Sequence, residues 1–291
     1  METMEYLRQQ HPYAYCYRSL VLAGCGLLSS SCVAPPSIST ERLCPFTGSE
    51  LILEVQAIAP NPPLTPALIQ ATADVVLERV TELNAFPASI VWDESGHITV
   101  QLPPDADVEQ ASQWLRSQGE LTFRPQKAES ATTELNTLLR ERQAIPVTDA
   151  AALAAMNTDI LALFDAPQIS SGDVRDAWVT VRTPEQFIEI GVEFNEVGAQ
   201  NFTEFTREIA GTGQAVGIFL DDMLISAPVV DASFAETGIP GNEAVIAGAF
   251  SMAEAEEIAA QIRSGAFPAP TSIASLQPIN LNASCEPVAG N

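Results

Sequence analysis

Five cysteines are the most reactive side chains of this 291-residue chain, and all of them lie toward one end or the other. They are Cys16, Cys25, Cys32, Cys44 and Cys285. In an exported protein an odd number leaves one thiol that cannot pair within the chain. If cleavage left Cys32 at a new terminus carrying a lipid, Cys44 and Cys285 would remain as one even pair.

An apolar run over residues 20–28 follows Arg18 and predicts a signal peptide over residues 1–32. The run is too short to span a bilayer. Ser29-Ser30-Ser31-Cys32 leaves it the usual length, whereas Leu22-Ala23-Gly24-Cys25 fits a lipoprotein cleavage box better but leaves only about four apolar residues of the usual roughly 7 to 15. We therefore predict lipidation at Cys32, with Cys25 as the alternative. The competing interpretation is an apolar patch at the terminus of a cytosolic protein.

The other candidates for chemistry are a carboxylate pair, Asp221-Asp222, and the strand histidine His97. A two-residue hairpin turn explains the pair better, because Asp tolerates a positive φ. Calcium at this turn would need further oxygen ligands that the sequence does not place. The chain has no nucleophile elbow, Cys/His ligand cluster or phosphate loop. We therefore expect no catalytic residue, no metal and no cofactor; a hydrolase that uses the acidic turn is the weakest alternative.

The charge balance is strongly acidic, with 13 Lys and Arg against 37 Asp and Glu and a net charge of −24. Phosphate binding needs a basic surface, so a nucleic-acid partner is excluded. A solvated protein surface explains this excess of acidic residues. The alternative is a cation-binding or salt-adapted role. With no run of about 18 apolar residues, the only membrane contact expected is the lipid anchor.

The clearest secondary-structure pattern lies between residues 188 and 262. It predicts a strand at 188–194, a helix with Gly198, Phe202, Phe205 and Ile209 on one face, a hairpin of 214–220 with 223–229, and a strand at 244–250. Ser251 and Glu254 form a capping box that opens a further helix, and Gly265 is placed to close it. Residues 177–182 are expected to pair with residues 187–194.

An earlier unit, residues 50–126, shows the order βαββαβ of a ferredoxin-like sandwich. The elements expected are a strand at 51–57, a helix opened by Thr65-Pro66, a hairpin of 88–93 with 97–102, a helix opened by Asp107 and Gln110, and a returning strand at 121–124. Between the units, residues 127–169 read as a helical hairpin of 129–142 and 148–164 broken by Ile145-Pro146. Its apolar faces predict packing, with a partner-binding arm as the alternative.

Four stretches of the second unit carry a resemblance to a known family. They are GVEFNEVGAQNFTEFTRE, IFLDDMLISAPVV, AVIAGAFSMAEAEEIA and RSGAFPAP, between residues 191 and 270. They resemble the first periplasmic domain of SecD, the accessory subunit of the bacterial preprotein translocase. The chain departs from the family at Asp222, where the family has Gly, and at residues 45–49, where the family has Asp-Leu-Lys-Gly-Gly.

This resemblance implies an α+β fold: a ferredoxin-like base unit, a second α+β head unit and a helical hairpin insertion. The expected domains are a signal peptide at 1–32, a tether at 33–49, the base at 50–126, the insertion at 127–169, the SecD-like unit at 170–282 and a tail at 283–291. In the family both ends of the domain return toward the membrane on the same side. That similarity implies a disulfide between Cys44 and Cys285.

The function implied is a non-enzymatic, lipid-anchored module on the periplasmic side of the bacterial envelope. Its partners would be unfolded or exported polypeptide and Sec translocase subunits. Such binding needs exposed apolar surface and open strand edges. The candidate residues are Met223, Ile225, Ala227, Pro228, Phe267 and Pro268, each of which a core position also explains. The alternative is a structural or assembly lipoprotein that keeps the fold without a role in secretion.

Overall fold

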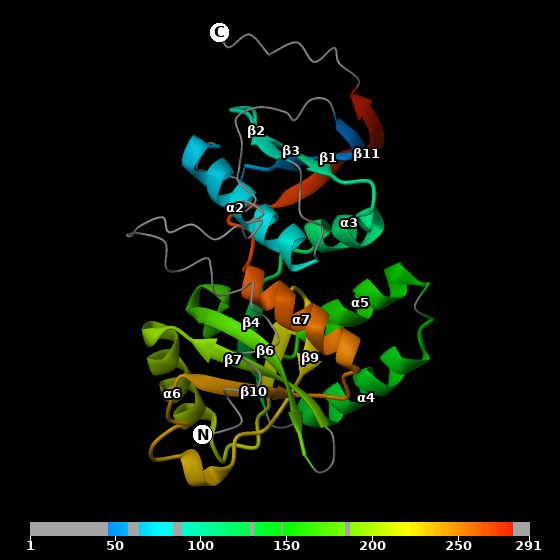
Figure 1. Cartoon of the computed structure of the whole chain (residues 1–291). Coiled ribbons are helices and arrows are strands. Elements are labelled where there is room, and N and C mark those ends of the chain that lie inside the picture. Colours follow the sequence, from blue (N-terminus) through cyan, green and yellow to red (C-terminus); the bar gives the residue numbers. More distant parts are fainter. Residues whose placement is uncertain are drawn as a thin grey trace. The chain divides into compact units, whose positions relative to one another are not determined.

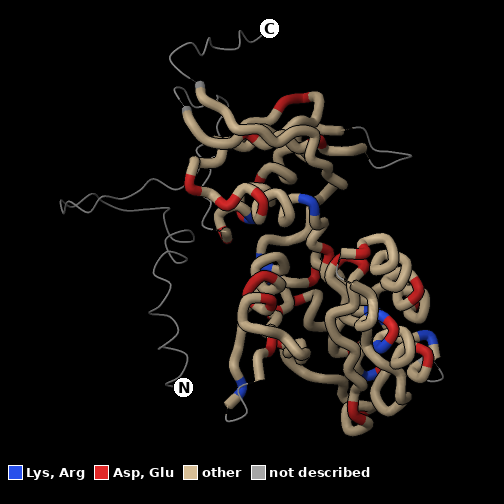
Figure 2. The backbone as a smooth tube through the Cα atoms, turned by 90° about the vertical axis from the view of Figure 1, so that its right-hand side faces the viewer, with Lys and Arg blue, Asp and Glu red and all other residues tan. Residues whose placement is uncertain are grey.

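The computed structural model describes residues 46–57, 64–83, 89–128, 131–146, 148–183 and 187–281 (Figure 1). Within these residues, three antiparallel sheets and six α-helices make the mixed α+β fold that the sequence predicts. Along the described backbone, Asp and Glu clearly outnumber Lys and Arg (Figure 2). Two groups of elements with separate apolar cores are distinguished below as the base and the head.

The base is a four-stranded sheet with two helices packed on it. Its strands stand in the order β11-β1-β3-β2, with bounds β1 Phe46–Val55, β2 Ser89–Trp92, β3 His97–Leu102 and β11 Thr271–Leu281. Helices α2 (Pro66–Glu82) and α3 (Val108–Arg116) bury their apolar side chains in the core of this unit. Both begin as predicted, because Thr65 Oγ1 accepts a hydrogen bond from the N–H of Leu68 and Asp107 accepts one from that of Gln110.

One prediction about the base is wrong. The strand expected at 121–124 to return to this sheet is β4 (Leu121–Pro125), which pairs instead with β8 (Val216–Leu220) and β5 (Ile169–Ser170). The fourth place in the base sheet belongs to β11, which pairs with β1 from Phe46 to Val55. The reason is packing, because Phe123 of β4 makes edge contacts with aromatic rings of the head and not with the base core.

The head contains a three-stranded sheet in the order β10-β7-β6. Its elements are β6 (Val174–Arg182), β7 (Phe187–Phe194), α6 (Glu196–Ile209), β10 (Glu243–Ala247) and α7 (Met252–Ser264). Helix α6 begins at Asn195, whose side chain accepts from the N–H of Gly198 at 2.9 Å, and α7 begins at the predicted capping box of Ser251 and Glu254. Helix α7 packs on β6 and β7 (Figure 1).

The second sheet of the head has the order β5-β4-β8-β9, which makes β9 (Met223–Ser226) an edge strand among the described strands. The predicted helical hairpin is present as α4 (Ala131–Ala144) and α5 (Ala150–Leu161). It packs on this sheet through a small core of Leu135, Ile160, Phe164, Phe219 and Leu224. These contacts favour the packing interpretation of the hairpin. Two short 3₁₀ turns, Ser171–Asp173 and Ala232–Phe234, complete the described elements.

Aromatic side chains hold the head core together. Phe194 of β7 stacks on Phe202 of α6 with ring centroids 4.8 Å apart, and Phe123 of β4 meets Phe194 edge-on at 5.8 Å. The predicted inner faces of both helices are buried here, including Phe205 and Ile209 of α6. Burial of these rings joins the two sheets of the head into one core.

Several predictions fall outside the described residues. They are the signal peptide at 1–32, the tether as far as residue 45, lipidation at Cys32 or Cys25, the disulfide between Cys44 and Cys285, and the tail at 283–291. Among the described helices, none combines the length and the apolar character that crossing a bilayer requires.

Candidate functional site

The Asp221-Asp222 turn joins β8 to β9 as predicted, and Asp221 adopts a positive φ of 54°. Its carboxylate is committed to structure: Oδ1 accepts from the N–H of Glu120 at 2.9 Å and Oδ2 from Ser117 Oγ at 2.7 Å. These bonds fasten the hairpin to the segment that leads from α3 to β4. The turn therefore helps to position β9, with a structural partner for each carboxylate oxygen of Asp221.

A pocket of about 730 Å³ lies along β9 and is here called the β9 pocket. The hairpin provides one side, α7 and the segment before it provide another, and α4 and α5 contribute one residue each. Its lining residues are Ser117, Arg142, Asn157, Leu220, Asp221, Asp222, Met223, Leu224, Ile225, Ala249, Phe250, Glu254, Glu257, Ile258 and Gln261.

The apolar part of the β9 pocket comes from both of its long sides. Met223 is 39% exposed, and Ile225 is half-buried against the head core. Phe250 and Ile258, from the α7 side, are half-buried in the same way. Because β9 is an edge strand, half of its backbone N–H and C=O groups are not used by its pairing with β8. The pocket thus offers apolar contacts beside open backbone groups.

Two buried polar atoms in the lining lack a partner within the part of the chain that the structure describes. They are Nε of Arg142 on α4 and Oδ1 of Asn157 on α5. Buried polar atoms in folded proteins nearly always carry a hydrogen bond. Both atoms are themselves buried, so an incoming chain could reach them only if the side chains moved.

The acidic residues of the lining differ in how firmly they are held. Glu254 accepts hydrogen bonds from the N–H and the hydroxyl of Ser251, which lowers the pKa of Glu254 and keeps it ionised. Glu257 Oε1 accepts from Trp114 Nε1 at 3.1 Å. Asp222 is exposed at the tip of the hairpin. The pocket is therefore bordered by two carboxylates that hydrogen bonds hold in place, Glu254 and Glu257, and by the exposed carboxylate of Asp222.

The structure brings together two of the six residues predicted to bind polypeptide, Met223 and Ile225. Ala227 packs against the small core under the α4–α5 hairpin. Pro228 is exposed, and its carbonyl accepts from the N–H of Val216. Phe267 is only 6% exposed and belongs to the base core, so it offers no open surface, while its neighbour Pro268 is exposed.

Sequence reasoning missed the residues that complete the pocket from other elements. Asn157 carried no clear signal, because it is the first of three consecutive polar residues, Asn157, Thr158 and Asp159, in α5. Arg142, Phe250 and the acidic face of α7 carried none, since their place depends on how the helices pack on the sheet.

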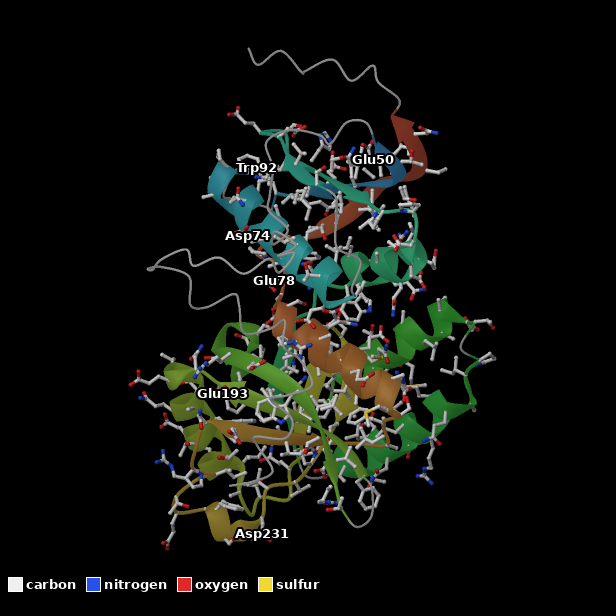
Figure 3. The ribbon with its side chains drawn as sticks, viewed as in Figure 1. Glu50, Asp74, Glu78, Trp92, Glu193 and Asp231 are labelled. Carbon is white, nitrogen blue, oxygen red and sulfur yellow. The ribbon has the colours of Figure 1, made fainter. Side chains whose placement is uncertain are left out.

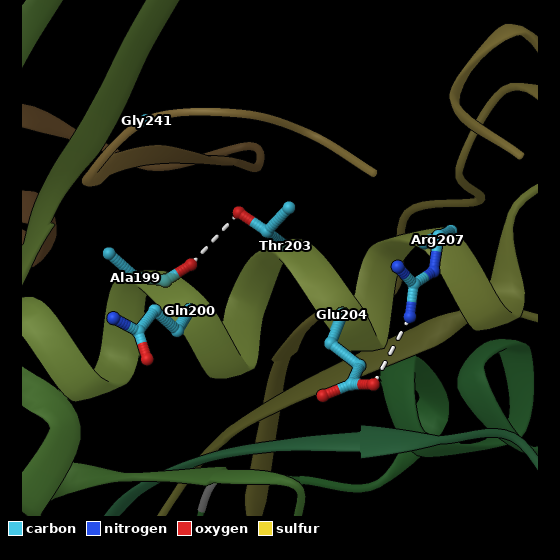
Figure 4. Close-up of a pocket in the computed structure, with 6 residues that line it drawn as sticks. All are labelled: Ala199, Gln200, Thr203, Glu204, Arg207 and Gly241. Carbon is cyan, nitrogen blue, oxygen red and sulfur yellow. Dashed lines mark hydrogen bonds and ion pairs between the residues drawn. The ribbon is translucent and has the colours of Figure 1, made fainter. Parts of the chain in front are cut away.

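A second, shallower pocket of about 410 Å³ lies on α6 (Figure 4). Its lining residues are Ala199, Gln200, Thr203, Glu204, Arg207 and Gly241. Thr203 Oγ1 donates to the carbonyl of Ala199 at 2.9 Å, and Arg207 pairs with Glu204 at 3.1 Å. This pocket is smaller than the β9 pocket, and no strand contributes to its lining. The β9 pocket is the stronger candidate.

Among the described residues, no group of three or more His, Cys, Asp or Glu side chains is placed to hold a metal ion.

Comparison with known proteins agrees with this architecture. The family model described as "SecDF, P1 head subdomain" matches residues 149–269. Protein translocase subunit SecD of Synechocystis is 32% identical over 244 residues, which cover 78% of this chain and 52% of that protein. SecD of Prochlorococcus marinus is 27% identical over 278 residues, with 80% and 56% covered. The chain thus spans about half the length of these relatives.

Two solved structures share the fold. "Crystal structure of SecDF in Super-membrane-facing form" superposes with a TM-score of 0.61 at 25% identity, over 79% of this chain and 30% of that one. "Structure and function of a membrane component SecDF that enhances protein export" superposes with a TM-score of 0.60 at 24% identity, over 79% of this chain and all of that one. The sequence matches, the head and base sheets and these superpositions together show that the chain carries a P1 domain of the SecD and SecDF family.

Proposed function

We propose that this protein is an accessory factor of protein translocation whose head binds unfolded or exported polypeptide in the β9 pocket. The relatives are named protein translocase subunits, and one solved structure is described as a component that enhances protein export. A binding role needs no reactive group, so we propose a non-enzymatic module. Sec translocase subunits are the partners that this role implies.

One observation carries the proposal: the open edge of β9 lies in the pocket beside the exposed Met223 and the half-buried Ile225, Phe250 and Ile258. An unfolded chain presents backbone N–H and C=O groups at every residue and apolar side chains at intervals. An added strand would pair its backbone with β9 and place alternate side chains against Met223 and Ile225.

We further propose that the base keeps a ferredoxin-like arrangement with β11 as its fourth strand. The spatial order β11-β1-β3-β2, with α2 and α3 between successive strands of the chain, supports this proposal. In such an arrangement the first and last strands of the base lie side by side.

For location, we propose the periplasmic side of the bacterial envelope, with a lipid on Cys32, or on Cys25 as the alternative. The support is the apolar run over residues 20–28 and the cysteines behind it. The competing function is a structural or assembly lipoprotein that retains the P1 fold without contact with exported chains.

Site-specific photo-crosslinking tests the proposed function. Met223→p-benzoylphenylalanine in the full, membrane-anchored chain is expected to form adducts with a reduced and unfolded test polypeptide. The matched control is Val197→p-benzoylphenylalanine, because Val197 is 61% exposed on α6 and does not line the β9 pocket. Equal yields at both positions would contradict the proposal. Adducts formed in cells only with envelope-assembly proteins would favour the competing function.

A further inference from the structure

The charges that line the β9 pocket are unequal. Asp221, Asp222, Glu254 and Glu257 contribute four carboxylates, and Arg142 contributes one guanidinium. Both carboxylate oxygens of Asp221 accept hydrogen bonds, from Ser117 and Glu120. Glu254 accepts through Oε2 and Glu257 through Oε1, so each of these carboxylates keeps a second oxygen, and Asp222 is exposed. Asp222 directly precedes Met223, so one acidic and one apolar contact are adjacent on the hairpin side.

The α7 side of the pocket repeats this combination. Glu254, Glu257, Ile258 and Gln261 stand at helical spacings of three, four and seven from Glu254, which places them on one face of the helix. Two carboxylates therefore flank an apolar side chain on that face. A ligand that lies along it meets negative charge directly beside each apolar contact.

A purely apolar ligand fits such a surface poorly. It would cover the carboxylates without replacing the hydrogen bonds that they make to water. A ligand with acidic side chains would add repulsion between like charges. A ligand with Lys or Arg next to its apolar residues would satisfy both kinds of contact.

We propose, on the basis of the proposed function, that the β9 pocket selects polypeptide segments in which Lys or Arg residues stand beside apolar residues. The apolar side chains contact Met223, Ile225 and Ile258, and the cations face Asp222, Glu254 and Glu257. These side-chain contacts decide which segment of a polypeptide binds. Backbone pairing with β9 adds binding that does not depend on the sequence of that segment.

Fluorescence anisotropy with three peptides tests this proposal in the purified full chain. The peptides share one apolar core and carry Lys, Ser or Glu flanks. We expect the Lys-flanked peptide to bind about tenfold more tightly than the Ser-flanked one at low salt, and the difference to shrink as salt is added. The Glu-flanked peptide is expected to bind most weakly.

The variant that removes the selection is Asp222→Asn, Glu254→Gln and Glu257→Gln in one chain. Gln keeps the capping box at position 254 and can still accept from Trp114 at position 257, so folding is preserved. The control is Glu208→Gln, Glu236→Gln and Glu243→Gln, which changes the net charge equally at exposed positions outside the pocket. The pocket variant should lose the preference for Lys flanks, and the control should keep it.

The outcomes separate this proposal from the proposed function. Equal affinity of the wild-type chain for Lys and Ser flanks overturns the selection while leaving polypeptide binding in place. Equal loss of preference in the pocket variant and the control also overturns it, because the attraction would then come from the overall charge of −24. Failure of all three peptides to bind overturns both proposals.

Discussion

The Nη2 atom of Arg79 lies 2.9 Å from the carbonyl oxygen of Gly265, so a side chain of α2 reaches the residue that ends α7. The same guanidinium donates to the carbonyls of Trp114, Ser117 and Gln118, and it lies 3.9 Å over the ring of Phe267. Residues 117–120 and 265–270 are the two chain connections between base and head. One fully buried side chain therefore holds both.

Burial lowers the pKa of Arg79 to about 10, and the charge of Asp221 opposes this effect. The guanidinium is still protonated at neutral pH, with four carbonyls as acceptors. We expect Arg79→Leu to destabilise the fold by about 3 kcal/mol, because buried acceptors lose their donor. Arg79→Lys should recover only part of this loss, since an ammonium lacks the planar fork.

Urea unfolding followed by circular dichroism measures this effect. Arg207→Leu is the matched control, because Arg207 is exposed and pairs only with Glu204 among the described residues. It should change stability by about 0.5 kcal/mol or less. Similar losses in the two variants would mean that the buried bonds of Arg79 contribute little.

Gly119 is predicted to tolerate no side chain. Its φ is 71°, and an added Cβ would lie 2.3 Å from Nη2 of Arg79 and 3.1 Å from the carbonyl of Gly265. Gly119→Ala should cost roughly 2 to 4 kcal/mol, combining backbone strain with displacement of the guanidinium. Gly241→Ala isolates the strain, because Gly241 has a φ of 109° and open space around its Cβ position. Urea unfolding measures both losses of stability. Equal losses in the two variants would contradict a clash between the added Cβ at position 119 and Arg79.

Glu78 on α2 should make the stability of the fold depend on pH. Its neighbour Asp74 lies on the same helix (Figure 3). Burial, followed by the charges of Glu82 and Asp74, raises the pKa of Glu78 above its ordinary 4.5, and Arg263 opposes this. The folded chain then binds more protons than the unfolded chain between these two pKa values. The contribution of Glu78 to the free energy of unfolding is therefore complete at low pH. It is lost as pH rises through that window.

Glu78→Gln is expected to raise the melting temperature at pH 7, and the gain should vanish at acid pH, where Glu78 is protonated in both states. Glu82→Gln is the contrasting variant. Glu82 makes two hydrogen bonds with the guanidinium of Arg263, so its loss should lower the melting temperature at pH 7. Calorimetry across pH decides; a Glu78→Gln gain that persists at acid pH would show that the charge is not its cause.

The disulfide between Cys44 and Cys285 remains a prediction, because both residues lie outside those described. The ladder of β1 with β11 ends at the pair Phe46 and Leu281. Cys44 stands two residues before that pair and Cys285 four after it, distances that the chain can bridge at roughly 3.5 Å per residue. The bond would add roughly 4 to 5 kcal/mol in the chain-entropy model.

Non-reducing peptide mapping of the exported protein tests this bond. The expected product is one peptide pair that separates on reduction, and Cys285→Ser should abolish it. Alkylation of both thiols without prior reduction would exclude the bridge.

Local sequence signals predicted the elements well, because caps and turns depend on neighbouring residues. Ser251 with Glu254 and the positive φ of Asp221 are examples. The strand that pairs with β4 could not be predicted from the sequence. The apolar residues Leu121 and Phe123 alternate with polar ones, and this pattern suits a strand of the base sheet as well as one of the head. Arg79 was missed although it follows Val76 by three on the buried face of α2, because buried arginines are rare.

The same limit applies to the β9 pocket. Met223 and Ile225 could be proposed from the hairpin alone, whereas Arg142 and Asn157 reach the pocket only through packing of α4 and α5. The use of Asp221 by Ser117 and Glu120 was equally hidden, because those residues are about a hundred positions away in the sequence.

The ladder between β1 and β11 also sets the order in which a newly made chain can fold. Thr47 and Asn280 lie 233 positions apart, and the whole head stands between them. During synthesis the head strands, which end with β10 at Ala247, leave the ribosome before Thr271 does. The head core also needs Ala255, Ala259 and Ile262 of α7, which ends at Ser264, just before β11 begins. The base sheet therefore cannot be completed until the whole head has been made, and until then one side of β1 is an open strand edge.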